Sequence, residues 1–387
     1  MLKNSLEGAR TPYLLVLALI LLGANPAIPQ IVRGIGIILF SIIIHHIYRN
    51  HKTFEHNNWP LLIVLICILP LTIIDLVKSL TEGFVTYSFV LIPVGALAGW
   101  MAVRSIGSHQ FATQYERVVF HLGILSLPGF VLFCVNPEIA RLFIPYQVDV
   151  FGVILENRTT ILQNFQFNPW PVFRNAGFAS EPGFFAVYLN IALSIHVQSG
   201  RISLVRTGLY ILLIFTTVST AGFVVLAINL LLSFRVRYLP VAAVALAIAS
   251  PILIPLAEEH VESRITSGVA YESRGAQSEL AIQLFLDNPL GIGAYEYERI
   301  YRKDTTVGSY DAYTQMALRY GFLGLFGLIF GIVLLMLRNL ALGAVIFVSL
   351  FTSPIWFIPA IFAIFSLDFV KQASQRQGHS AERRAFA

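Results

Sequence analysis

The stretch AYTQMALRYGFLGLFGLIFGIVLLML, residues 312–337, decides the fold class of this chain. It holds 26 residues and a single charged side chain, Arg319. A helix needs about 20 mostly apolar residues to cross a hydrocarbon core of about 30 Å, because each residue rises about 1.5 Å. The stretch therefore predicts a membrane-spanning helix.

Apolar runs of this kind repeat along the whole chain. Hydrophobic residues make up 56% of the sequence and charged residues only 12%, against about 25% charged residues in a soluble domain. We predict an all-α fold, a polytopic transmembrane helix bundle of about 12 spans that forms one integral membrane domain over residues 1–387. The last run is too long for one crossing and holds Ser353-Pro354 near its middle, so we interpret it as two short spans. Besides residues 312–337, the apolar runs are 12–22, 31–48, 61–77, 84–103, 118–135, 178–196, 204–218, 221–234, 239–256 and the long last run 340–370.

The basic residues predict the orientation of the bundle. Lys and Arg are distributed among short loops on one side of the predicted membrane bundle, which indicates that this side is cytoplasmic. Both termini, with a tail at 371–387, are then cytoplasmic. The opposite side carries Asp75 and Glu82 in a short loop and two long loops, 136–177 and 257–310, in which we expect short amphipathic helices. The net charge of +5 reflects this topology; because it forms no basic stripe, it does not indicate nucleic-acid binding.

Polar residues gather in three segments at the predicted non-cytoplasmic ends of spans. The first reads RNAGFASEPGF, residues 174–184, and leads into an apolar run. Pro182 suits the first turn of a helix and Ser180 or Glu181 suits its cap. With Arg174 just upstream, such a helix start predicts an anion site. The alternative is that Arg174 reaches the lipid headgroups and Glu181 only caps the helix.

The second segment, residues 272–286, has one apolar and one polar face and predicts a short amphipathic helix. Asn288-Pro289 ends it, and Gly291 and Gly293 predict a turn. Arg274 lies in the first turn of this helix. A cation there is unfavourable unless an anion arrives, which indicates an anionic ligand.

In the third segment, residues 309–324, helical spacing places Asp311, Gln315 and Arg319 on one stripe. Arg319 is expected either to be neutralised inside its own helix, as a structural pair, or to face the same cavity. Gly321, Gly324 and Gly327 predict close helix packing. The sequence holds no Walker loop, zinc-protease motif or nucleophile elbow, so we expect no metal and no nucleotide cofactor.

The order of these segments resembles the O-antigen polymerase and O-antigen ligase superfamily of bacterial envelope glycosyltransferases. The similarity covers residues 170–335 in motif order and the whole chain in hydropathy layout. Residues 174–184 look like the family's Arg, Gly and Glu-Pro segment. Ser273-Arg274 with residues 288–293 look like its Ser-Arg, helix, Pro-Leu-x-Gly-x-Gly pattern. Residues 310–324 look like its third element, usually written His-Asn-x-Tyr-Leu before a Gly-rich helix.

The resemblance implies transfer of a saccharide from an undecaprenyl diphosphate donor to a sugar hydroxyl at the outer face of the bacterial inner membrane. Arg174 and Arg274 would hold the diphosphate, because the Arg fork suits phosphate oxygens and stays charged. Glu181 is the first candidate base and Asp311 the second. Tyr310 and Asp311 stand where the family has His and Asn, which leaves the base open. Possible supporting residues are Ser273, Tyr310, Gln315 and Arg319.

The leading hypothesis is a polymerase that joins lipid-linked oligosaccharide units into O-antigen, capsule or exopolysaccharide, with a chain-length regulator and a flippase as possible partners. A ligase that moves finished glycan to lipid A core is the close alternative, although Tyr310 in place of His weakens it more. A flippase or transporter would carry its charges along a path across the membrane. A structural scaffold would leave Arg174 and Arg274 without a shared ligand.

Overall fold

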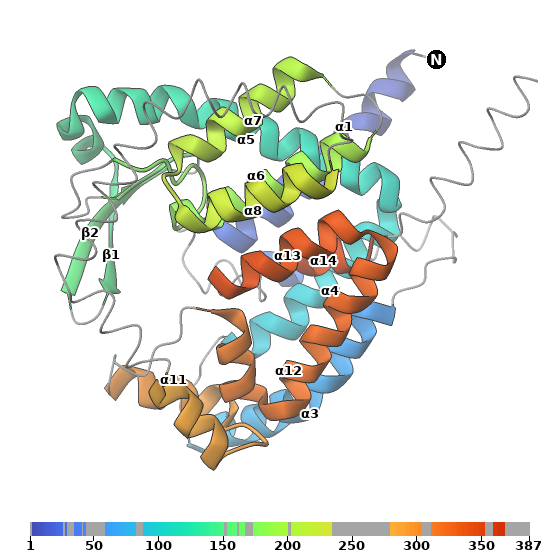
Figure 1. Cartoon of the computed structure of the whole chain (residues 1–387), viewed down its shortest axis with the longest axis vertical. Helices are drawn as coiled ribbons and strands as arrows, with labels where there is room; N and C mark the ends of the chain where they lie inside the picture. The colour runs from blue at the N-terminus through green and yellow to red at the C-terminus, as the bar shows by residue number, and fades with distance from the viewer. Residues whose placement is uncertain are drawn as a thin grey trace, which may run out of the picture.

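A computed structural model describes residues 2–25, 28, 35–40, 42–43, 59–82, 88–150, 153–160, 162–166, 173–199, 203–233, 279–303, 311–352 and 359–367. These residues are mostly helical (Figure 1). The predicted span at 239–256 lies outside them. The helices are α1 (Leu2–Ala24), α3 (Trp59–Glu82), α4 (Ser88–Ile106), α5 (Ser108–Val135), α6 (Pro182–Gln198), α7 (Leu204–Thr216), α8 (Thr220–Ser233), α11 (Gly293–Lys303), α12 (Ala312–Arg338), α13 (Leu340–Thr352) and α14 (Pro359–Phe365).

Among the described helices, α5 and α12 are long and apolar enough to cross a membrane by length and composition. Shorter apolar helices occur at Thr11–Gly23, Val64–Val77, Leu204–Thr216, Thr220–Leu232 and Leu340–Phe351. The predicted helical character is thus confirmed for the described part of the chain. The count of about 12 spans stays a prediction.

The first long loop corrects the all-α prediction, because it carries a small β-sheet. After a 3-10 helix at Pro137–Leu142, the strands β1 (Ile144–Val150), β2 (Val153–Thr159) and β3 (Asn164–Gln166) form an antiparallel sheet in the order β1-β2-β3. Ile144 pairs with Thr159 and Arg158 pairs with Phe165. The physical reason lies in the strand sequences, because β1 and β2 each contain three β-branched residues, which favour strands.

One predicted break between helices is observed. Helix α7 ends at Thr216 and α8 begins at Thr220. Between them Val218 has φ of +43°, a conformation rare for a β-branched residue, and it interrupts the helical path. The division of the last run that we predicted at Ser353-Pro354 lies outside the described residues, between α13 and α14.

Helix α6 forms the centre of the upper part of the bundle in Figure 1, where it lies beside α5, α7 and α8. Every side chain of α6 from Phe184 to Val197 is buried. A helix that is apolar on all sides is stable only when other elements cover all of it, which explains this central position. The loop before α6 and the residues at its C-terminal end therefore occupy opposite ends of a well-packed unit.

Candidate functional site

The loop that carries Arg174 is held by one buried amide, Asn175. Its Nδ2 donates to Ser126 Oγ of α5 and to Thr216 Oγ1 of α7, both at 3.0 Å. Its Oδ1 accepts from Gln163 Nε2 at 3.2 Å and from the Gly177 N–H at 2.9 Å. Because Asn175 has no exposed surface, these bonds act without competition from water and fix the loop against two helices.

The small sheet supports the same loop from the other side. The Asn164 N–H donates to the Gly177 carbonyl at 2.6 Å. Its side-chain Nδ2 donates to the carbonyls of Ala179 at 3.2 Å and Ser180 at 2.8 Å. The first long loop is therefore the platform that positions the start of α6.

Arg174 and Glu181 lie on this platform. The Arg174 side chain is half-buried, and its Nε donates to the Thr217 carbonyl, at the C-terminal cap of α7, at 3.2 Å. Pro182 is the first residue of α6 and Glu181 occupies its N-cap position, as predicted. The Glu181 side chain is exposed and accepts no capping hydrogen bond from α6, so capping does not account for this carboxylate.

The turn predicted in the second segment is confirmed, and it lies against α12. The helical residues 279–287 end before Asn288, and Gly291 and Gly293 have φ of +87° and +83°. The Ile292 N–H donates to the Leu318 carbonyl at 2.8 Å. The Phe322 N–H donates to the Pro289 carbonyl, also at 2.8 Å. Residues 289–292 are thus bonded to the backbone of α12.

Gly321 corrects the prediction that it serves close packing of a regular helix. Its φ of 62° and ψ of −159° are non-helical and divide α12. A Cβ on Gly321 would lie 2.2 Å from the Leu290 carbonyl carbon. The missing side chain admits the turn, and the turn satisfies backbone groups that the break releases, as buried peptide groups require.

Asp75 corrects a second expectation, because it lies inside α3 and not in a short loop. It is 1% exposed, and its Oδ2 accepts from the Ala294 N–H at 2.6 Å. A carboxylate at the N-terminus of α11 is favoured by the helix dipole. Asp75 therefore joins α3 to the helix that follows the turn.

In the third segment, Asp311 is the N-cap of α12 and its Oδ1 accepts from the Thr314 N–H at 2.7 Å. Gln315 is 9% exposed. Arg319 is half-buried, and its guanidinium carbon lies 4.5 Å from the ring centre of Tyr297 in α11. Within the described residues, Arg319 Nε is buried without a hydrogen-bond partner. Arg319 is therefore stacked on the Tyr297 ring. Its Nε forms no hydrogen bond with a residue of its own helix.

Three predicted site residues, Ser273, Arg274 and Tyr310, lie outside the described residues. Whether Arg274 approaches Arg174 stays a prediction. The described candidates divide between the start of α6, which has Arg174 and Glu181, and the start of α12, which has Asp311, Gln315 and Arg319. No protein-family model and no curated protein matches this chain.

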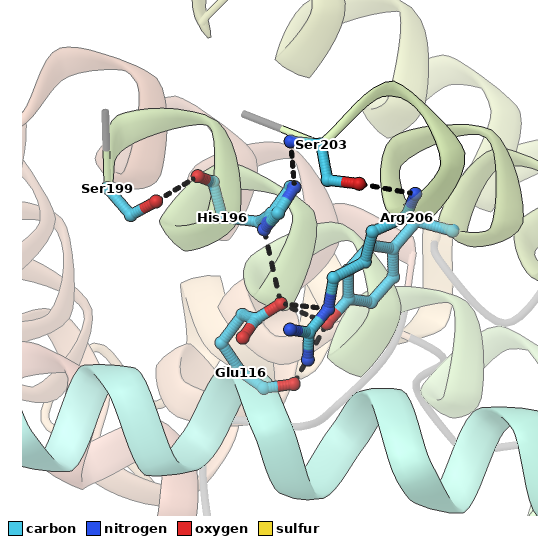
Figure 2. Close-up of polar contacts among 6 residues, drawn as sticks. Glu116, His196, Ser199, Ser203 and Arg206 are labelled. Atoms are coloured by element: carbon cyan, nitrogen blue, oxygen red, sulfur yellow. Dashed lines mark hydrogen bonds and ion pairs between the residues drawn. The ribbon is translucent and has the colours of Figure 1, made fainter. Parts of the chain in front are cut away.

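The sequence did not lead us to a polar cluster at the other end of α6 (Figure 2). Glu116 Oε1 lies 2.9 Å from Arg206 Nε, in an ion pair whose N–H is not aligned for a hydrogen bond. The same oxygen lies 3.3 Å from His196 Nδ1 and accepts from the Tyr210 hydroxyl at 3.0 Å. Glu116 and His196 are 6% and 5% exposed. One carboxylate oxygen thus joins α5, α6 and α7.

The proton on His196 follows from its second nitrogen. The Ser203 N–H donates to His196 Nε2 at 3.4 Å, so that nitrogen accepts, and Nδ1 carries the proton that faces Glu116. The Arg206 guanidinium carbon also lies 4.2 Å from the ring centre of Phe120. The members of the cluster bind one another, which is consistent with a structural role in holding α5, α6 and α7 together. The sequence signal for it was the presence of His196 and Arg206 within apolar runs.

Proposed function

We propose, first, that the chain is an integral membrane protein. The supporting observation is the exposed apolar face of α12, where Phe322, Phe326 and Phe330 are 61%, 50% and 38% exposed. Soluble proteins rarely expose large contiguous apolar patches. The 18 residues between Arg319 and Arg338 carry no charge. At about 1.5 Å per residue they span about 27 Å, close to the thickness of the hydrocarbon core.

We propose further that it polymerises undecaprenyl-diphosphate-linked oligosaccharide units into a surface polysaccharide on the outer face of the bacterial inner membrane. The observation that carries the proposal is the rigid loop before α6, which presents a half-buried Arg174 and an exposed Glu181 within eight residues of sequence. Asn175 and Asn164 fix this loop by hydrogen bonds. Such pre-organised charges are what a transferase needs, since they require no rearrangement during the reaction.

The chemistry assigns a task to each group. The acceptor hydroxyl attacks the anomeric carbon of the donor sugar, and the bond from that carbon to the diphosphate oxygen breaks. The diphosphate leaves with the electron pair, and the Arg174 guanidinium stabilises its negative charge. The Glu181 carboxylate takes the proton from the acceptor hydroxyl. Arg274 is the second cation of the proposal, and Asp311 is the alternative base.

The test is the length of polysaccharide made by a strain that lacks the chain and carries variants of it. Arg174→Ala abolishes long polymer, and Arg174→Lys shortens it because a point charge replaces the planar fork. Arg141→Ala is the matched control, because Arg141 lies in the same long loop but is 68% exposed and ion-paired with Glu138. Polymer of full length from Arg174→Ala would refute the role of Arg174.

The same strain without any copy of the chain decides between the two transferase classes. Single repeat units on the lipid core indicate lost polymerisation, as proposed. Long polymer that accumulates on undecaprenyl indicates lost ligation and would replace the polymerase assignment. For Glu181→Gln, a full rate at every pH would rule out Glu181 as the base.

A further inference from the structure

Arg319 holds a charge that the described protein residues do not neutralise. Its Nε is buried without a hydrogen-bond partner, and its guanidinium carbon lies over Tyr297, which is 3% exposed. A half-buried cation without an anion is costly, and stacking on a ring recovers only part of that cost. Because a buried ring holds it, the Arg319 guanidinium is kept in one position. The arrangement is that of a fixed cation in need of an anion.

The backbone on both sides of Arg319 is fixed as well. The Leu318 carbonyl accepts from Ile292, and the Phe322 N–H donates to Pro289. A Cβ on Gly291 would lie 2.9 Å from the Arg319 carbonyl oxygen, so the turn is in close contact with this residue. The cation is therefore pre-organised, which lowers the entropic cost of binding an anion.

An aromatic stripe begins three residues after Arg319. The ring centres of Phe322 and Phe326 are 6.4 Å apart, and those of Phe326 and Phe330 are 5.7 Å apart. Residues four apart share one face of a helix, and all three rings are exposed. Three residues of chain reach at most about 11 Å, so the stripe starts close to the cation.

We propose that Arg319, Tyr297 and the aromatic stripe of Phe322, Phe326 and Phe330 form a binding site for one anionic phospholipid. The Arg319 guanidinium contacts the lipid phosphate, and one acyl chain lies along the stripe. Arg319 directly precedes the uncharged 18-residue run, which places it at the depth of lipid phosphates. The lipid carries a net negative charge, because the ammonium of a zwitterionic headgroup would already neutralise its own phosphate.

This inference rests on the membrane location proposed above and not on glycosyl transfer. Its test therefore uses binding alone. Purified full-length protein in neutral detergent is titrated with dioleoyl phosphatidylglycerol or dioleoyl phosphatidylcholine. Bound lipid is counted by native mass spectrometry, and the melting temperature is followed, since a ligand of the folded state raises it.

Wild-type protein retains one phosphatidylglycerol in preference to phosphatidylcholine. Arg319→Gln weakens its binding about ten-fold or more, the scale of a lost hydrogen bond between charged groups, and Arg319→Lys retains part of the affinity. Arg299→Gln leaves binding unchanged, because Arg299 is already paired with Glu296 at 2.6 Å. Equal retention by wild type and Arg319→Gln, or no preference between the two lipids, overturns the proposal.

Two further measurements test the chain-binding part. Phe326→Ser weakens phosphatidylglycerol binding while the melting temperature in pure detergent stays near that of wild type, because Phe326 is half exposed. Inorganic phosphate at the same concentration does not raise the melting temperature. Stabilisation by phosphate alone, with no effect of Phe326→Ser, overturns a lipid site and indicates a site for a free anion. Loss of polymerisation in Arg174→Ala alongside intact lipid retention separates the two proposals.

Discussion

The contact between the 289–292 turn and α12 predicts an unusually damaging glycine substitution, Gly291→Ala. A Cβ at this position would lie 2.5 Å from the Gly321 nitrogen and 2.9 Å from the Tyr320 carbonyl carbon. Both are backbone atoms, so no side-chain rotation relieves the overlap. The φ of +87° adds strain for any residue with a Cβ.

The magnitude follows from these two effects. A left-handed conformation costs an alanine about 1–2 kcal/mol. Forced overlap in a packed region costs about 1–3 kcal/mol more. We therefore expect Gly291→Ala to lower the free energy of unfolding by about 2–5 kcal/mol. The substitution also pushes the turn out of the break in α12 and leaves the Leu318 carbonyl and the Phe322 N–H without their partners.

Two other glycines provide matched controls. Gly107 has φ of +82° but open space around its missing Cβ, so Gly107→Ala isolates the conformational strain of about 1–2 kcal/mol. Gly208 lies in α7 with open space and no unusual φ, so Gly208→Ala is neutral or stabilising by up to about 1 kcal/mol. In thermal unfolding in detergent, we expect the order from most to least stable to be Gly208→Ala, wild type, Gly107→Ala and Gly291→Ala. Equal stability of the Gly107 and Gly291 variants would show that the turn is not seated against Gly321.

Three other substitutions test the remaining contacts. Asp75→Ala removes the cap of α11 and leaves the Ala294 N–H unpaired. We therefore expect faster amide exchange over residues 293–303, equivalent to a loss of about 1–3 kcal/mol in the free energy of local opening, and a smaller loss for Asp75→Asn. Unchanged exchange in Asp75→Ala contradicts the cap. Asn175→Ala removes four side-chain hydrogen bonds and lowers stability by about 2–4 kcal/mol together with polymer length; normal polymer length dissociates the loop from activity. Glu116→Gln costs about 1–3 kcal/mol, discounted because Arg206 is 26% exposed, and a double-mutant cycle with Arg206→Gln that gives no coupling rejects the ion pair.

The sequence predicted those features that depend on local chemistry. Pro182 marks the first residue of α6, because proline is suited to that position. The end of a helix before Asn288-Pro289 and the turn at Gly291 followed from the same kind of rule. Each of these needs only a few neighbouring residues, and each was found where it was expected.

The features that sequence reasoning missed depend on contacts between distant residues. Asp75 caps α11 across 219 residues, and Tyr210 bonds Glu116 across 94. The break at Gly321 exists because the 289–292 backbone is there to satisfy its groups, which no helical pattern in residues 312–337 reveals. The β-sheet was missed because the expectation for a membrane bundle was applied to a loop whose strands β1 and β2 are rich in β-branched residues.

A pair of amides shows how the candidate segments relate across the bundle. Gln198 Nε2, at the last residue of α6, donates at 3.1 Å to the Oδ1 of Asn339, the C-cap of α12. The two C-terminal ends therefore meet, and both N-terminal ends point away from that junction. Glu181 occupies the N-cap position at one of these N-terminal ends, and Asp311 caps the other through its side chain. The topology prediction requires the first and third polar segments to open helices that start on the same side of the membrane. The Gln198–Asn339 contact brings the opposite ends of α6 and α12 together, and the topology itself stays a prediction.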